Sequence, residues 1–187
     1  KTVLERLVIW LLFFGILGAR LYHVVDYWEY YSQDLILIFM VWNGGLGIWG
    51  GLLGGSLGVY LFSVSSKLKF WELMDGVVVG VPVAQAIGRL GNWVNGELYG
   101  KNGEPLFAWE GGLNLVLFLV LWNLAKQKKS SGFLTGVYLI GYGLIRIFLE
   151  NFRDGEMIWK LGSTPTAIIF GIIAVGTGIN LTCRKLS

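Results

Sequence analysis

Long apolar runs separated by short polar segments recur along the whole chain. Six runs approach or exceed the roughly 20 helical residues that cross a hydrocarbon core of about 30 Å. They cover residues 4–25, 44–64, 74–94, 106–125, 133–151 and 163–182. No internal repeat or Pro/Ser-rich linker divides them. The pattern predicts an all-α fold: a polytopic membrane helical bundle with about six transmembrane helices, short outer-face loops and a single domain over residues 1–187.

The composition supports a membrane protein. The chain is 55% hydrophobic and 14% charged, with a mean hydropathy of +0.62, which lies outside the balance of soluble domains. Nine Trp and eight Tyr suit anchoring at two membrane interfaces, and 28 Gly suit close helix packing. The first run lacks a small-residue cleavage site and contains Arg20, which favours a retained span over a signal peptide. No basic block of the nucleic-acid-binding type is present, so no nucleic-acid partner is expected.

Basic residues are unevenly distributed between the two sides of the predicted bundle. Lys and Arg near span ends favour the cytoplasm. With the N-terminus inside, the cytoplasmic side holds Lys1, Arg6, Lys67, Lys69, Lys126, Lys128, Lys129, Arg184 and Lys185. The outer side holds only Lys101, Arg153 and Lys160. This asymmetry predicts a cytoplasmic C-terminus and three outer loops, at residues 26–43, 95–105 and 151–162.

Charged residues gather at one membrane depth in this topology. The outer halves of the spans, or the positions just beyond them, contain Arg89, Glu97, Glu110, Arg146 and Glu150. A charge at membrane depth costs about 2.5 to 3.5 kcal/mol on insertion scales and generally has a function. The five groups predict a shared polar cavity that opens toward the outer leaflet. The alternative is a set of structural ion pairs that only hold the helices together.

The segment 88–100, GRLGNWVNGELYG, is the densest cluster of polar and glycine residues at membrane depth. Arg89 offers a planar fork of donors to a phosphate, while Asn92 and Asn95 supply neutral hydrogen bonds. Glu97 is suited to orienting an arginine or accepting a hydrogen bond from a glycerol hydroxyl. A lipid headgroup fits these side chains.

This segment has the form G-R-x-G-N-[FW]-x-N-x-E-x-x-G and resembles the signature of the prolipoprotein diacylglyceryl transferases. Residues 18–21 (GARL), 42–51 (WNGGLGIWGG) and 141–153 (GYGLIRIFLENFR) agree with the family in the same order. The resemblance implies transfer of the sn-1,2-diacylglyceryl group of phosphatidylglycerol to the lipobox cysteine thiol of a prolipoprotein signal peptide, which forms a thioether and releases glycerol phosphate. It also implies a location in the bacterial cytoplasmic (inner) membrane, among membrane lipids, and catalysis without a cofactor.

Catalytic roles follow from this resemblance. Arg89 and Arg146 are the candidates for stabilising the leaving phosphate by preorganised electrostatics. The thiol, with a pKa of about 8.5, must also lose its proton. Many family members carry a histidine where this chain has Trp49. The single histidine, His23, is the candidate replacement base, and the alternatives are a purely structural His23 with Tyr22, Glu97 or the field of the arginines in its place.

Substrate binding is expected from seven residues, four of which also have a structural interpretation. They are Arg20, Tyr22, Gly44, Gly45, Asn92, Asn95 and Glu150. Arg20 lies near a span end and could snorkel to lipid phosphates, and Glu150 could hold Arg146 at i+4. The glycines at 54, 55 and 58 predict helix packing, and the first pair, Gly44 and Gly45, fits either packing or a substrate path. Asp75 is predicted to cap the N-terminus of the third span, with a catalytic acid as the alternative.

Two further features depart from the family pattern. The usual H-P-[ST]-Q-L-Y-E becomes EPLFAWE at residues 104–110, which removes polar support around the cavity. Family members usually have seven spans, and this chain begins where their second would begin, so an N-terminal helix is expected to be absent.

Two other functions remain open. Intramembrane arginines in glycine-interrupted spans also fit a small anion transporter, although the first and last three spans show no inverted repeat. A catalytically silent, lipid-binding homologue is the third hypothesis, favoured by Trp49. No metal site is expected, because one His and one Cys form no typical cluster, and Cys183 is interpreted as an inert tail residue.

Overall fold

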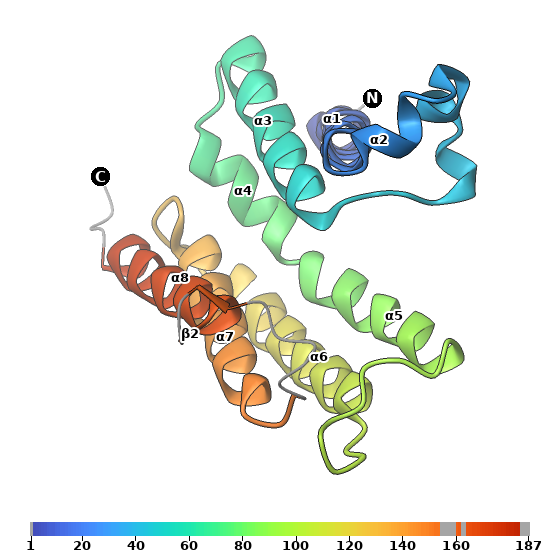
Figure 1. Cartoon of the computed structure of the whole chain (residues 1–187). Coiled ribbons are helices and arrows are strands. Elements are labelled where there is room, and N and C mark those ends of the chain that lie inside the picture. The colour runs from blue at the N-terminus through green and yellow to red at the C-terminus, as the bar shows by residue number, and fades with distance from the viewer. Residues whose placement is uncertain (1, 154–159, 162–163, 184–187) are drawn as a thin grey trace. The chain divides into compact units, whose positions relative to one another are not determined.

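The computed structural model describes residues 2–153, 160–161 and 164–183, and this part of the chain is predominantly helical (Figure 1). The α-helices are α1 (Val3–Asp26), α2 (Trp28–Tyr31), α3 (Ile48–Ser66), α4 (Phe70–Val78), α5 (Val81–Val94), α6 (Leu106–Ala125), α7 (Phe133–Glu150) and α8 (Thr166–Thr182). Two 3-10 helices, η1 (Leu35–Phe39) and η2 (Val41–Asn43), follow α2. The strands β1 (Lys160–Leu161) and β2 (Thr164–Pro165) pair antiparallel, with Lys160 opposite Pro165. The prediction of an all-α fold is confirmed.

Several helices are long and apolar enough to cross a membrane. Within the described ranges these are α1, α3, α6 and α7, and α4 and α5 qualify together as one span bent by 42°. The apolar helix α8 is 17 residues long. A polytopic helical membrane protein is therefore confirmed, while the count of six spans and their orientation stay predictions.

Two span boundaries differ from the predicted ones for local reasons. The second run was expected to start at residue 44, but α3 begins at Ile48, because Gly44 and Gly45 have φ of +85° and +73° and cannot continue a right-handed helix. The third run is broken between Val78 and Val81. Pro82, in the first turn of α5, has no N–H to donate to the preceding turn, so α4 ends and α5 starts at a new angle.

Contacts divide the chain into two units, residues 1–73 and 74–187, each described by itself. In the first unit α1 packs closely on α3 through glycines. A Cβ at Gly18 would lie 2.9 Å from Gly54 Cα, and one at Gly58 would lie 2.9 Å from the Trp10 carbonyl oxygen. The packing role predicted for Gly54 and Gly58 is confirmed. A Cβ at Gly55 would meet no atom within 4 Å, so that glycine does not mediate the close approach.

The second unit contains α5 to α8. Its core is formed by buried side chains of α6 and α7, namely Leu106, Leu117, Leu121, Ile145 and Leu149. On its other side α7 meets α8 at two glycine pairs: a Cβ at Gly136 would lie 2.7 Å from the Gly178 oxygen, and one at Gly143 would lie 2.8 Å from the Gly171 oxygen. Small residues let these backbones approach without a water-driven hydrophobic effect. This packing holds the α7 residues that face α6.

Asp75 caps a different helix from the one predicted. It lies inside α4, where its Oδ2 accepts from the Gly132 N–H (2.7 Å) and its Oδ1 accepts from the Thr135 N–H (2.8 Å) and hydroxyl (2.7 Å). These N–H groups belong to the first turn of α7, whose N-cap is Gly132. Glycine has no side chain to serve as a cap, so the carboxylate from α4 satisfies the exposed donors. The expectation of a cap for the third span is therefore wrong.

We predict that Asp75→Ala lowers the free energy of unfolding by about 1 to 3 kcal/mol, because buried N–H groups at the start of α7 lose their acceptor. The measurement is denaturation of the purified protein in detergent. Glu72→Ala is the matched control on the same helix. Its exposed ion pair with Lys69, 3.6 Å long, is worth about 0 to 1 kcal/mol. Equal effects of the two substitutions would contradict the role of Asp75.

Candidate functional site

The carboxylate of Glu110 lies between two arginines from neighbouring helices. Its Oε1 accepts from Arg89 Nη2 of α5 at 2.9 Å, and its Oε2 pairs with Arg146 Nη1 of α7 at 3.5 Å. The Glu110 side chain is 1% exposed, whereas those of Arg89 and Arg146 are 26% and 20% exposed. A buried carboxylate thus holds two cations whose outer surfaces stay accessible.

Further polar groups extend this cluster on both sides. Arg89 Nη1 donates to Asn92 Oδ1 (2.7 Å), and Asn92 Nδ2 donates to Glu97 Oε2 (3.2 Å). Glu150 Oε2 lies 3.8 Å from Arg146 Nη2 and 3.5 Å from Arg153 Nη1. The five charges predicted to gather are therefore brought together, and Glu150 holds Arg146 at i+4 as expected. Asn95 is exposed at the C-cap of α5, where its N–H bonds to Gly91 and Trp93 oxygens.

The connection after α5 sets the register between α5 and α6. Gly96 (φ +68°) and Leu98 (φ +63°) turn the chain in the left-handed region, which is uncommon for a leucine. The Glu97 N–H bonds to the Asn92 oxygen at 2.8 Å, and the Lys101 N–H bonds to the Phe152 oxygen at 2.9 Å. These bonds tie the loop to the ends of α5 and α7. Glu110, one turn into α6, is consequently level with Arg89.

Glu104 organises this loop. Its carboxylate accepts from the Asn102 side-chain amide (2.9 Å) and from the Asn102 N–H (3.0 Å). These hydrogen bonds, that of the side-chain amide first, lower the pKa of Glu104 below its ordinary value. The carboxylate of Glu104 therefore stabilises this loop.

In the first unit Arg20 donates all five of its N–H groups to backbone carbonyls. Nε bonds to the Ile38 oxygen (2.8 Å), Nη1 to the Gly44 (2.6 Å) and Gly45 (2.9 Å) oxygens, and Nη2 to the Leu37 and Met40 (3.2 Å) oxygens. Arg20 is 5% exposed, and its guanidinium lies 5.0 Å from the centroid of the Tyr31 ring. These carbonyls lie in irregular backbone outside the regular α-helices, so a buried guanidinium supplies hydrogen bonds that they would otherwise lack. This geometry makes Arg20 the support of the η1–η2 segment, and its substrate-binding role stays a prediction.

A cavity of about 270 Å³ lies beside this support, lined by Arg20, His23, Tyr30, Tyr31, Leu37, Asn43, Gly44 and Gly45. His23 Nδ1 shares a hydrogen bond with the Tyr31 hydroxyl at 3.2 Å, and its ring stacks on Tyr27 with centroids 4.6 Å apart. Tyr22 instead packs against α3, where a Cβ at Gly47 would lie within 3.3 Å of its ring. The first unit thus brings Arg20, His23, Gly44 and Gly45 together.

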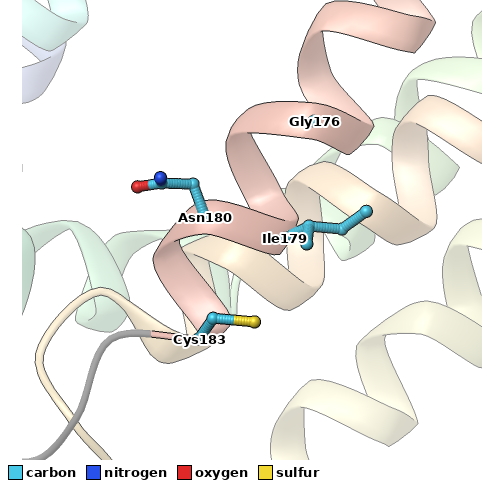
Figure 2. A pocket seen from close by; sticks show the side chains of 4 residues that line it. All are labelled: Gly176, Ile179, Asn180 and Cys183. Carbon is cyan, nitrogen blue, oxygen red and sulfur yellow. The ribbon is translucent and has the colours of Figure 1, made fainter.

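A larger hollow, of about 620 Å³, lies at the end of α8 (Figure 2). The described residues that line it, Gly176, Ile179, Asn180 and Cys183, come from one helix and its C-cap and carry no charge. Cys183 is exposed and free. The predicted chemistry requires cations, which the described residues bring together around Glu110 instead. No group of three potential metal ligands occurs in the described parts of the chain.

Sequence reasoning underestimated Glu110, which it placed in the polar cluster without giving it a role. The signal was its position, as the only acidic residue of the fourth apolar run. It also missed the buried amides of Gln85 and Asn114, each one helical turn from a cluster residue on the same helix. Both were visible in the sequence as polar residues on the same helix face as a charged residue, since Gln85 lies four residues before Arg89 and Asn114 four residues after Glu110.

Comparisons with known proteins agree over nearly the whole chain. The profile of the family described as prolipoprotein diacylglyceryl transferase matches residues 1–184. The chain is 35% identical over 178 residues to the phosphatidylglycerol–prolipoprotein diacylglyceryl transferase of Clostridioides difficile (strain 630), covering 88% of this chain and 71% of that protein. It is 32% identical over 206 residues to the protein of that name from Listeria innocua (97% and 74% covered). The corresponding protein of Finegoldia magna is 32% identical over 199 residues (99% and 80% covered).

We predict that Gly45→Ala destabilises the protein more than Gly44→Ala. Both substitutions force an alanine to positive φ, which costs about 1 to 3 kcal/mol. Only at Gly45 does the new Cβ also meet neighbours, Arg20 Nη1 at 2.7 Å and the Tyr31 hydroxyl at 2.9 Å, whereas at Gly44 it meets no atom within 4 Å. Thermal denaturation of both variants in detergent makes the comparison. A Gly44→Ala variant as unstable as Gly45→Ala would show that backbone strain alone is responsible.

Proposed function

The chain belongs to the prolipoprotein diacylglyceryl transferase family, and from this premise we propose that Arg89 and Arg146 bind the phosphate of phosphatidylglycerol while its diacylglyceryl group passes to a prolipoprotein. The protein is a transferase of bacterial lipoprotein biosynthesis, as the motif resemblance predicted. The observation that carries the proposed roles is the bridge from one buried carboxylate, Glu110, to both guanidinium groups.

The bridge preorganises the two cations. A guanidinium carries five N–H donors, and the contacts described above use two on Arg89 and two on Arg146. The remaining donors lie on side chains that are about a quarter and a fifth exposed. A phosphate that arrives there meets fixed donors and requires little reorganisation, which is the condition for electrostatic catalysis.

The reaction places new charge at this position. The thiol sulfur forms a bond to the terminal glycerol carbon of the diacylglyceryl group, and the bond from that carbon to the phosphate oxygen breaks. The phosphate group changes from a singly charged diester to a more highly charged monoester, and the thiol proton passes to a base. Two cations on the phosphate stabilise the leaving group more than the substrate, which accelerates the step.

The proposed base is His23. Its Nδ1 shares a hydrogen bond with Tyr31, and its ring lines the 270 Å³ cavity of the first unit. When Nδ1 carries the proton, Nε2 is the acceptor available to a thiol. Tyr22, exposed Glu97 and the field of the arginines are the alternatives. The lipobox cysteine within its signal peptide is the proposed acceptor, reached from the outer leaflet of the bacterial inner membrane.

We predict that Arg89→Ala and Arg146→Ala each lower the transfer rate by about 10- to 150-fold, because a charge-assisted contact is worth about 1.5 to 3 kcal/mol. The assay mixes purified protein, phosphatidylglycerol in detergent and a lipobox peptide with one cysteine, and detects the diacylglyceryl thioether by mass spectrometry. Rates within about threefold of the parent for both variants would refute the assignment.

Arg6→Ala is the matched control, since Arg6 lies in the first turn of α1, outside the proposed machinery. If the folded parent protein yields no thioether, the function reduces to that of a silent lipid-binding homologue, the reading that Trp49 in place of the family histidine favours. Anion flux in liposomes without a covalent product would instead indicate transport.

We predict that His23→Gln lowers the rate by about 10²-fold or more if the imidazole is the base, because general-base catalysis contributes about 10² to 10⁴. Tyr31→Phe keeps the ring beside Arg20 and removes only the hydroxyl that contacts His23. We therefore expect it to change the pH dependence of the transfer rate and to leave the thermal stability close to that of the parent protein. A His23→Gln variant that transfers within about threefold of the parent would leave His23 a structural residue of α1.

A further inference from the structure

A second polar layer lies one helical turn below the Arg89–Glu110–Arg146 cluster. Gln85 precedes Arg89 by four residues on α5, Asn114 follows Glu110 by four on α6, and Tyr142 precedes Arg146 by four on α7. Residues at i and i+4 share a helix face. Since α5 and α6 run in opposite directions and Arg89 meets Glu110, Gln85 and Asn114 lie at one level on faces directed toward the same seam.

Polar atoms of this layer lack partners among the residues that the structure describes. Asn114 is 0% exposed, and neither its Oδ1 nor its Nδ2 is hydrogen-bonded. Gln85 Oε1 is also buried without a partner, although Gln85 Nε2 donates to the Tyr138 hydroxyl at 3.0 Å. Above them Arg89 Nε is buried and unpaired. Buried polar groups in folded proteins are almost always hydrogen-bonded to protein, ligand or ordered water, so a hydrogen-bonding partner is expected at each of these atoms.

The unmatched atoms define the chemistry of that ligand. Asn114 Nδ2 and Arg89 Nε are donors, whereas Asn114 Oδ1 and Gln85 Oε1 are acceptors. A group that both accepts and donates satisfies them, which a hydroxyl does and which neither a phosphate nor an ammonium does. The amides are neutral, so they select a polar group without net charge.

We propose that Asn114, Gln85 and Arg89 Nε form an internal site for a hydroxyl group, supplied by the headgroup glycerol of the lipid substrate or by water. The proposal rests on the proposed function, in which Arg89 holds the adjacent phosphate. One helical turn of about 5.4 Å separates the two layers, a distance comparable with the length of a three-carbon glycerol. Arg89 has atoms of both kinds, because its Nη atoms belong to the ion-pair cluster whereas its Nε is buried and unpaired among the described residues.

This site would read the lipid headgroup. Phosphatidylglycerol ends in a diol, whereas a lipid with the same phosphate and a plain alkyl alcohol leaves the amides unpaired. A site built to hydrogen-bond a hydroxyl rejects the analogue that lacks it more strongly than an apolar pocket rejects an added group. The amide layer would thus supply headgroup selectivity, while the arginines supply affinity for the phosphate that all these lipids share.

The test compares two lipids and two variants. Phosphatidylpropanol has the charge and chain length of phosphatidylglycerol but neither headgroup hydroxyl. Asn114→Leu removes the unpaired amide at similar volume, and Asn123→Leu makes the same change at an exposed position of α6. Transfer rates on both lipids, and the thermal midpoint of each protein without and with lipid, are measured on the full chain in detergent.

If the headgroup is the ligand, the kcat/KM of the parent protein is about tenfold or more higher on phosphatidylglycerol than on phosphatidylpropanol. Asn114→Leu then slows transfer from phosphatidylglycerol alone, so that the ratio of the two kcat/KM values falls to within about threefold. If water is the ligand, Asn114→Leu lowers the thermal midpoint below that of Asn123→Leu and leaves the lipid ratio unchanged. Both results support a hydroxyl site and identify its source.

The proposal is overturned if Asn114→Leu is at least as stable as Asn123→Leu and has the same ratio of kcat/KM values on the two lipids as the parent protein. A buried amide without a hydrogen-bond partner costs free energy, so replacing it by leucine would not destabilise the protein. If Asn114→Leu does not fold, Gln85→Met, which removes the unpaired Oε1 at similar length, is judged by the same ratio. A parent protein without transfer from either lipid contradicts the proposed function, and the comparison of thermal midpoints still decides whether a hydroxyl site exists.

Discussion

The buried carboxylate of Glu110 is the constraint on which the second unit depends. An ionised group that is 1% exposed in an apolar helix is stable only with cations and donors around it. Arg89 of α5 and Arg146 of α7 supply them, so α5, α6 and α7 must meet at one level. The loop after α5 and the capping of α7 by Asp75 both serve that alignment.

Arg20 is also a buried charged side chain, but its hydrogen-bond partners are backbone carbonyls instead of side chains. Its five donors satisfy backbone carbonyls of the irregular segment around η1 and η2. Arg89 and Arg146 instead bond mainly to side chains and keep exposed surface. The three arginines therefore divide into one that supports backbone and two that pair with side chains and stay partly exposed, a division made by their neighbours and not by their residue type.

Some features were predictable from the chain because they depend on local chemistry. The ends of α6 and α7 followed the apolar runs to within a residue, and the clustering of Arg89 with Glu110 and Arg146 followed from their shared depth. The bend before Pro82 was readable in principle from the missing N–H. The partner of Asp75 was not, because Gly132 and Thr135 lie 57 and 60 residues away, and any of several helix starts could have used the carboxylate.

By itself the sequence determined that this is a helical membrane protein, because hydropathy over a span is a property of contiguous residues. It also determined the family, because the thirteen-residue motif is contiguous as well. Only the tertiary structure decided which polar groups are satisfied. Hydrogen bonds and ion pairs require atoms within about 3 to 4 Å, and the chain reaches those distances only after helices distant in sequence have packed. Three features arise only at that stage: the pairing of Glu110 with two arginines, the hydrogen bonding of every Arg20 donor to backbone, and the unpaired amide of Asn114.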